Sequence, residues 1–179
     1  PGEVRLKVAA AGICGTDVHI CSGDPSMNGL IAPPVTLGHE FCGHIDKLGD
    51  GVDEKKHPLG TYASAEMHEI CGDCPACRAE AFHACATARI RGINLNGAFA
   101  EYVIVSAANV IKLPEDLPLQ VAAILDPLGN AVHTTMKVPI ENKTVAIIGF
   151  GPIGAMCGEL ATFINASHVF VVDVADKAL

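Results

Sequence analysis

A glycine-rich turn late in the sequence most constrains how this chain can fold. An apolar run of strand length, residues 144–148, leads into Gly149, Gly151 and Gly154 and a helix-like segment, residues 152–163. Glycines at this spacing permit a tight turn, close approach of a pyrophosphate and close packing of the helix on the strand. The helix N-terminus adds free N–H groups and a favourable dipole. The pattern predicts the first strand and helix of a Rossmann dinucleotide-binding fold; the alternative is an ordinary strand-to-helix turn.

An acidic residue follows the second strand expected in this region. The apolar segment 169–172 leads to Asp173, nineteen residues after Gly154. An acid here accepts hydrogen bonds from the adenosine ribose hydroxyls and disfavours a 2′-phosphate, which predicts NAD rather than NADP as the cofactor. Lys177 is also assigned to this site, and its charge weakens the discrimination against NADP. Because a full Rossmann sheet has about six strands, we expect residues 141–179 to hold only the beginning of such a domain.

The residues before this turn predict a mostly β first domain. Polar and apolar residues alternate over residues 3–8, as in a half-buried strand. Further strand-like segments, separated by Gly, Pro and Asn turns, are residues 43–48, 100–105 and 109–113. Helical spacing follows Leu117, with a break at the Asp126–Pro127 step. The sequence therefore predicts an α/β protein in which an irregular β-barrel domain, residues 1–140, precedes the dinucleotide-binding segment.

The charge balance argues against nucleic acids and membranes as partners. The chain has 12 Lys and Arg against 20 Asp and Glu, a net charge of −8, whereas both partners require clustered cations. Mean hydropathy is +0.36, but no apolar run reaches the roughly 20 residues of a membrane span. No basic segment followed by an apolar run marks an export signal. We therefore expect a cytoplasmic protein that acts on a small molecule and uses its cysteines as thiols or metal ligands.

Four cysteines within one short segment have the spacing of zinc ligands. The segment CGDCPACRAEAFHAC, residues 71–85, places Cys71, Cys74, Cys77 and Cys85 at intervals of three, three and eight. Cysteines three apart can present both sulfurs to one ion across a tight turn, and four thiolates close a tetrahedral site with no open position. The alternative is free or disulfide-bonded cysteines, although disulfides between such near neighbours are strained. We predict a structural zinc site.

Three separate segments offer ligands for a catalytic zinc, which needs three protein ligands and one open position. Cys14 follows an apolar run, His39 and Glu40 precede a predicted strand, and Asp126 stands at the helix break. A cysteine, a histidine and an aspartate together would neutralise the charge of the ion. Taken singly, each is more often a packing or solvated residue, so spacing alone does not join them.

A family resemblance joins these residues. The segments AAAGICGTDVHI, LGHEFCG, the four-cysteine loop, GAFAEYV, LDPLGNAVHT and the glycine-rich turn occur in the order seen in zinc-dependent medium-chain dehydrogenases. The chain resembles this family over nearly its whole length, and ICGTDVHI with DPLGNAVHT is most similar to the L-threonine 3-dehydrogenase branch. The resemblance implies a GroES-like β-barrel catalytic domain before a Rossmann domain, one catalytic and one structural zinc ion in each chain, NAD, and a homotetramer for the complete protein.

The resemblance also implies a role for each candidate residue. The matching positions are Cys14, His39 and Asp126 for the ligands of the catalytic zinc, Glu40 for an acid that can exchange with the bound water, Thr16 and His19 for a proton relay, His68 for a neighbour of the substrate, and Gly149, Gly151, Gly154 and Asp173 for the NAD site. An alternative for Thr16 is that it only caps a helix. Around residues 57–64 the chain departs from the family's Gly-Asp-Arg-Val turn, which leaves the local loop geometry open.

The activity implied by the resemblance is oxidation of the 3-hydroxyl of L-threonine to 2-amino-3-oxobutanoate with hydride transfer to NAD. Two alternatives stay open. A zinc polyol or secondary-alcohol dehydrogenase would share the same metal chemistry. A zinc- and dinucleotide-binding module without turnover would need only the four-cysteine zinc, so metal content separates it from an enzyme.

Overall fold

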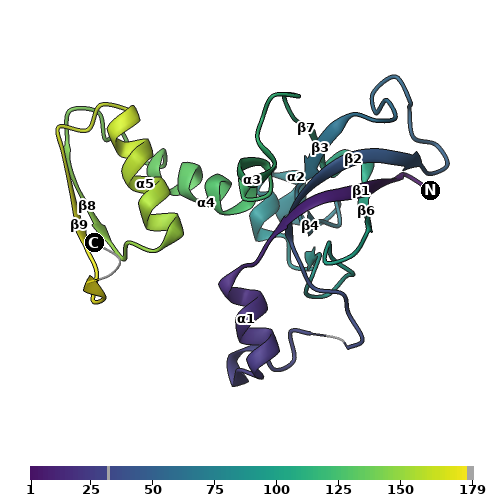
Figure 1. Cartoon of the computed structure of the whole chain (residues 1–179), viewed down its shortest axis with the longest axis horizontal. Helices are drawn as coiled ribbons and strands as arrows, with labels where there is room; N and C mark the ends of the chain where they lie inside the picture. The colour runs from purple at the N-terminus through teal and green to yellow at the C-terminus, as the bar shows by residue number, and fades with distance from the viewer. Residues whose placement is uncertain (32, 177–179) are drawn as a thin grey trace. The chain divides into compact units, whose positions relative to one another are not determined.

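The computed structural model describes residues 1–31 and 33–176 and divides the chain into two compact units, Pro1–Ile124 and Leu125–Leu179. Figure 1 follows the elements of each unit in chain order. Lys177, which sequence analysis assigned to the NAD site, lies outside the described residues. Among the helices of the described residues, none has both the length and the apolar character needed to cross a bilayer.

The first unit is built around a five-stranded antiparallel sheet with the order β6-β1-β2-β3-β7 (Figure 1). Its strands are β1 (Glu3–Gly12), β2 (Glu40–Leu48), β3 (Tyr62–Ala65), β6 (Tyr102–Ser106) and β7 (Val110–Lys112). The alternation predicted for residues 3–8 is present, because Val4 and Leu6 are fully buried and form the core with Phe41, Ile45 and Val105. The mixed α/β class with a β-rich first part is thus confirmed, and β1 continues beyond the predicted strand as far as Gly12.

Two short strands carry the cysteine-rich loop. Strand β4 (His68–Glu69) pairs antiparallel with β5 (Arg89–Ile90), which closes the base of segment 71–85. The loop contains helix α2 (Pro75–Arg78) and the 3-10 turn η2 (Phe82–Ala84). The unit also holds helices α1 (Gly15–Ser22) and α3 (Leu119–Ala122) and the 3-10 turns η1 (Pro25–Met27) and η3 (Ala107–Asn109).

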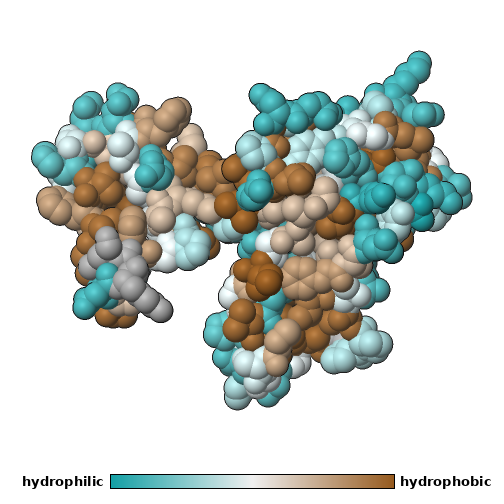
Figure 2. All heavy atoms as spheres, in the orientation of Figure 1, coloured by the Kyte–Doolittle hydropathy of each residue, from teal (hydrophilic) through white to brown (hydrophobic). Residues whose placement is uncertain are grey.

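The second unit contains the predicted strand, helix and strand. Strands β8 (Thr144–Ile148) and β9 (His168–Val172) are parallel neighbours, and helix α5 (Pro152–Phe163) connects them. A two-stranded sheet covers little of its own apolar surface, and several large side chains here remain exposed: Ile148, Phe163, Phe170 and Val172. Figure 2 shows apolar surface (brown) on both units.

The boundary between the units falls between Ile124 and Leu125, earlier than the boundary predicted near Ile140. The reason is that helix α4 (Leu125–Thr135) packs on α5 of the second unit. Small residues allow this contact, since Ala131 and Ala161 are both buried and Cys157 Sγ donates to the Ala131 carbonyl oxygen at 3.8 Å.

The helix break also lies earlier than predicted. Helix α3 ends at Ala122 and α4 begins at Leu125, so Pro127 stands in the first turn of α4 instead of interrupting a helix. Proline is tolerated there because the first N–H groups of a helix have no intrahelical partner.

Candidate metal centres and nucleotide-binding turn

Strand pairing brings the first group of candidate metal ligands together. The end of β1 lies beside the start of β2, with Gly12 opposite Glu40. Cys14 follows β1 as the N-cap residue of α1, and His39 directly precedes β2. As a result, the donor atoms of Cys14, His39 and Glu40 all lie within 4.8 Å of one another. A thiolate, an imidazole and a carboxylate at this separation are a donor set that zinc accepts.

Glu40 takes part in this group because the residue opposite it is glycine. A Cβ at position 12 would lie 2.5 Å from Glu40 Oε2, so a larger residue would displace the carboxylate. Asp126 is carried by the second unit, in the first turn of α4, where its backbone carbonyl oxygen accepts a hydrogen bond from Asn130 Nδ2 at 3.1 Å. Its role as a zinc ligand stays a prediction.

Asp17, a buried residue in the first turn of α1, lies behind this group. Its Oδ2 accepts a hydrogen bond from the Cys14 N–H at 2.9 Å, and its Oδ1 lies 3.7 Å from His39 Nδ1. Both side chains are buried, and within the described residues neither Asp17 Oδ1 nor His39 Nδ1 has a hydrogen-bond partner. A carboxylate behind a ligating histidine fixes the ring and raises its basicity. Asp17 could have been identified from the sequence, because it follows Cys14 by three residues, which is the spacing of a capping box at the start of a helix.

Replacing Asp17 with asparagine is expected to lower the zinc affinity of this centre about 10- to 100-fold, the range measured for partners that orient a ligating histidine. The amide oxygen can still accept the Cys14 N–H, but no charge then faces His39. Competition with a chromogenic chelator measures the loss. Asp46→Asn removes another carboxylate, paired with Arg5 on the same sheet, and should leave the affinity unchanged. An Asp17→Asn protein with full affinity would contradict this role.

The two predicted relay residues lie along α1. Thr16 is the second residue of α1, and its Oγ1 lies 3.7 Å from Cys14 Sγ, beside the candidate ligands. Thr16 is not the N-cap residue, because Cys14 occupies that position. His19 is exposed, and its Nδ1 lies 2.9 Å from Asp24 Oδ2. A proton relay requires this order, from the candidate metal ligand Cys14 to the Thr16 hydroxyl to the exposed His19 ring. The relay itself stays a prediction.

The four cysteines of segment 71–85 converge on one point. All four sulfurs lie within 4.8 Å of one another, and three separations are 3.5 Å (Cys74–Cys77), 3.7 Å (Cys71–Cys85) and 3.9 Å (Cys71–Cys77). A tetrahedral ion with Zn–S bonds of about 2.3 Å separates its sulfurs by about 3.8 Å. The set therefore fits zinc with no open position. None of these cysteines forms a disulfide in the described structure.

Local contacts give the thiols of the loop different pKa values in the metal-free protein. The Asp73 N–H, with that of Cys74, lowers the pKa of Cys71 from 9.0 to about 6, whereas burial raises the pKa of Cys77 to about 12. Cys71 is also exposed. Because the thiolate is the reacting species, iodoacetamide at neutral pH is expected to modify Cys71 before Cys77 once zinc is removed. The Cys71 rate should rise through about pH 6 instead of 9.0. Peptide mass spectrometry after a timed pulse tests this, and faster modification of Cys77 would contradict it.

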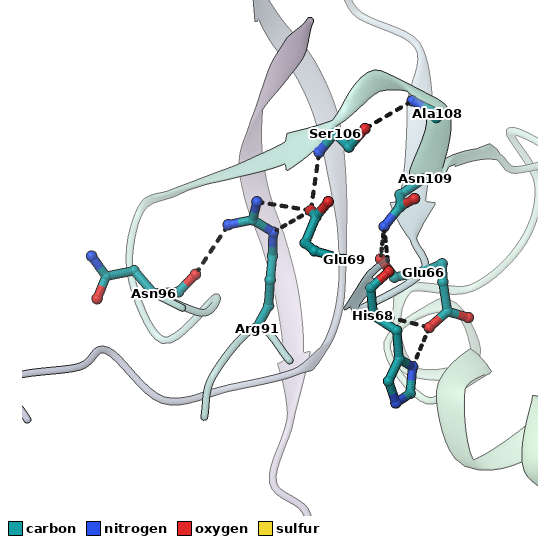
Figure 3. Close-up of polar contacts among 8 residues, drawn as sticks. All are labelled: Glu66, His68, Glu69, Arg91, Asn96, Ser106, Ala108 and Asn109. Atoms are coloured by element: carbon teal, nitrogen blue, oxygen red, sulfur yellow. Dashed lines mark hydrogen bonds and ion pairs between the residues drawn. The ribbon is translucent and has the colours of Figure 1, made fainter. Parts of the chain in front are cut away.

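His68 lies in β4 at the base of this loop, and the structure does not include it in the Cys14–His39–Glu40 group. Figure 3 shows its ring beside Glu66, whose Oε1 lies 2.5 Å from His68 Nδ1, while Asn109 Nδ2 donates to the His68 carbonyl oxygen at 2.9 Å. A cavity of about 700 Å³ next to His68 is also lined by Phe82 and His83 of the cysteine loop. The position of His68 beside the substrate stays a prediction.

The glycine-rich turn has the conformation that its sequence predicts. Gly149 has a φ of 93°, in the left-handed region that favours glycine. A Cβ at position 154 would lie within 3.0 Å of the Gly149 carbonyl oxygen, so Gly154 allows α5 to pack against the turn. Gly151 is the N-cap residue of α5 and Pro152 its first residue. The turn thus joins β8 to a helix N-terminus, the arrangement that receives a pyrophosphate.

Asp173 follows β9 and contacts this turn. Its Oδ2 accepts the Phe150 N–H at 2.7 Å, and its Oδ1 accepts the Ala175 N–H at 2.8 Å. These hydrogen bonds, that from Phe150 first, hold the pKa of the carboxyl below its usual value. The acid and the glycine turn therefore lie together, as the predicted NAD site requires, while the contacts to the cofactor stay predictions.

Comparison with known proteins agrees with this arrangement. Residues 1–115 match the alcohol dehydrogenase GroES-like domain. The chain is 43 % identical over 176 residues to an L-threonine 3-dehydrogenase of Caldanaerobacter subterraneus subsp. tengcongensis, covering 98 % of this chain and 50 % of that protein. Two solved structures give a TM-score of 0.89 at 35 % identity over 99 % of the chain: galactitol-1-phosphate dehydrogenase from Escherichia coli, of which it covers 50 %, and a putative zinc-binding dehydrogenase from Sinorhizobium meliloti 1021 bound to NADP, of which it covers 51 %.

The chain spans about half the length of these relatives. The domain match covers most of the first unit, including Cys14, His39, Glu40 and all four loop cysteines. The likeness to dehydrogenase structures extends through the strand, helix and strand of the second unit. This chain therefore belongs to the alcohol dehydrogenase GroES-like domain family, as its resemblance to the zinc-dependent medium-chain dehydrogenases implied.

Proposed function

We propose that the protein containing this chain is a zinc-dependent dehydrogenase that oxidises the 3-hydroxyl of L-threonine to 2-amino-3-oxobutanoate and transfers the hydride to NAD. The observation that carries the chemistry is the grouping of Cys14, His39 and Glu40 donor atoms within 4.8 Å. Identities of 43 % and 41 % with L-threonine 3-dehydrogenases, over nearly the whole chain, support the choice of substrate.

Cys14 and His39 would hold the catalytic zinc, with Glu40 within reach of the same ion. Zinc bound there supplies a Lewis acid that lowers the pKa of a substrate hydroxyl. Thr16 would accept the hydroxyl proton, a role supported by the position of its Oγ1 beside Cys14. His19 can pass that proton to water, because its ring is exposed and histidine exchanges protons near neutral pH.

The second unit supports hydride transfer by holding the dinucleotide. The N-terminus of α5 offers N–H groups to the pyrophosphate, and the ionised Asp173 offers acceptors to the adenosine ribose. Because its carboxylate is already bound to the Phe150 N–H, Asp173 holds its charge at the turn where a 2′-phosphate would have to fit. This charge favours NAD.

A second candidate is a polyol dehydrogenase. It is favoured by the TM-score of 0.89 with galactitol-1-phosphate dehydrogenase, at 35 % identity. The ligands and the relay would serve a polyol hydroxyl in the same way, so only the substrate contacts differ.

The test is NADH formation by the full-length, zinc-loaded protein with L-threonine, galactitol 1-phosphate and a simple secondary alcohol at equal concentrations. L-Threonine is expected to give the highest kcat/KM by at least about tenfold, a difference of about 1.4 kcal/mol in transition-state binding. Preference for the sugar phosphate would support the polyol candidate. No turnover with any substrate, in a protein that binds only the zinc ion of the four-cysteine loop, would support a module without catalytic activity.

A further inference from the structure

A largely buried ion pair connects the base of the four-cysteine loop with neighbouring strands. Glu69 lies in β4, two residues before Cys71, and Arg91 directly follows β5. Arg91 Nε and Nη2 donate to Glu69 Oε1 at 3.1 and 2.9 Å, and the two side chains are only 9 % and 17 % exposed. Figure 3 shows the same oxygen accepting the Ser106 N–H, at 3.3 Å, which links the pair to the end of β6. Neither side chain was singled out by sequence analysis.

Beyond Arg91 the chain binds the turn that carries His39. Arg91 Nη1 donates to the Asn96 carbonyl oxygen at 3.5 Å (Figure 3). The next three backbone N–H groups, of residues 97–99, donate to carbonyl oxygens of residues 36–38 at 2.7, 2.8 and 2.9 Å. The Asn96 side chain adds a fourth bond by accepting the Thr36 N–H at 3.0 Å. We call these paired segments, residues 96–99 and 36–38, the clamp. His39 is the residue directly after it.

Glycines allow the segments of the clamp to pack in close backbone contact. Gly38 has a φ of 94°, and a Cβ there would lie 2.5 Å from the Phe99 ring. A Cβ at Gly97 would lie within 3.0 Å of the Gly38 carbonyl oxygen, and one at Gly92 would lie 2.8 Å from the Gly38 carbonyl carbon. Backbone therefore contacts backbone with no flexible side chain between, so a shift of the segment after Arg91 must move Gly38 and with it His39.

The strands that hold the ion pair depend on the loop. Strands β4 and β5 pair through His68–Ile90 and Glu69–Arg89, and the Arg91 N–H adds one bond to the Met67 carbonyl oxygen at 3.1 Å. A hairpin this short is marginally stable alone. Four thiolates closed around an ion join Cys71 to Cys85 and thereby hold the two strands in register. Zinc in the loop would therefore stabilise the arrangement in which Glu69 faces Arg91.

We propose that Glu69 and Arg91 are positioning residues that couple the two metal centres, so that zinc in the four-cysteine loop raises the metal affinity of the Cys14–His39–Glu40 centre through the clamp. Packed contacts and hydrogen-bond networks carry such coupling, and the coupling must be reciprocal. The inference rests on the two metal centres of the proposed function and is independent of its substrate.

The test is a double-mutant cycle in the full-length protein with Co²⁺ as the probe, since a four-thiolate site and a one-thiolate site have different absorption spectra. Cys85→Ser removes a loop ligand. Arg91→Lys keeps the positive charge but loses the planar guanidinium group, which donates two hydrogen bonds to Glu69. Each is expected to lower the Co²⁺ affinity of the Cys14–His39–Glu40 centre about tenfold. Both substitutions act along one route. The Co²⁺ affinity of the Cys14–His39–Glu40 centre in the double variant should therefore equal that of the single variant with the lower affinity.

Two further variants keep the result interpretable. Arg78→Lys alters an exposed ion pair with Asp73 on the same loop and should change neither affinity. Gly97→Ala disturbs the clamp without touching either charge, and should weaken the Cys14–His39–Glu40 centre while the loop centre loads fully. Unchanged affinity in Arg91→Lys or Gly97→Ala, or losses that add in the double variant, would overturn the proposal. Absence of turnover with L-threonine would count against the proposed function alone, because this readout is metal affinity.

Discussion

Replacing Cys14 with serine in the full-length protein is expected to remove one of two zinc ions and to lower kcat/KM about a thousandfold or more. Cys14 supplies the one thiolate of the Cys14–His39–Glu40 group, and a serine hydroxyl is a poor zinc ligand at neutral pH. Lewis-acid stabilisation is worth several kcal/mol, and each 1.36 kcal/mol is tenfold in rate. Zinc content by mass spectrometry, measured beside NADH formation, gives both quantities on one sample.

Cys21→Ser is the matched control for this substitution. Cys21 is an exposed residue of the same helix α1 and belongs to neither group of metal ligands in the part of the chain that the structure describes. It should retain both zinc ions and full turnover. Turnover that survives in Cys14→Ser would refute the assignment of Cys14, and loss of turnover with both zinc ions retained would show that Cys14 acts other than as a ligand.

Replacing Gly154 with alanine is expected to destabilise the second unit by about 1–3 kcal/mol, the usual cost of forcing an extra carbon into a packed site. The new Cβ would lie within 3.0 Å of the Gly149 carbonyl oxygen, so the turn and the start of α5 must separate. Since that turn is the predicted pyrophosphate site, NAD affinity should fall about 10- to 100-fold, by the same free energy. NADH fluorescence titration and urea unfolding measure the two effects.

Gly158→Ala tests whether the effect belongs to the turn. Gly158 lies within the same helix, and its Cβ would meet Ile147 Cδ1 and Phe150 Cε2 at 3.5 Å, an ordinary contact. Alanine is favoured over glycine inside a helix by about 1 kcal/mol. This variant should bind NAD normally and unfold at the same or a higher urea concentration. Equal NAD affinity in both variants would remove Gly154 from the cofactor site.

The glycine-rich turn and the four-cysteine loop could be predicted from the sequence because both are local. All four predicted zinc ligands of the loop lie within residues 71–85, so a short loop brings their sulfurs to separations that fit zinc. In the turn, the left-handed φ of Gly149 and the missing Cβ of Gly154 follow from residue type and spacing. Asp173 is reached by one helix and one strand of ordinary length, so its return to the turn was also predictable.

The meeting of Cys14 with His39 and Glu40 required the tertiary structure. Taken singly, these residues carried no ligand spacing, and only the family resemblance joined them. The pairing of β1 with β2, which sets Gly12 opposite Glu40, places the two chain segments together. The same pairing puts the Asp17 carboxylate behind His39, a contact between residues far apart in the sequence.

Long-range packing decided the remaining features. The first unit ends at Ile124 because α4 packs on α5, which helical spacing alone could not assign to either side of a boundary. Glu69 and Arg91 lie on either side of the cysteine loop in the sequence and meet where β4 pairs with β5. Residue type and local spacing determined which chemical groups this chain carries. Strand register and close backbone packing determined which of those groups face one another, because such contacts depend on many residues at once.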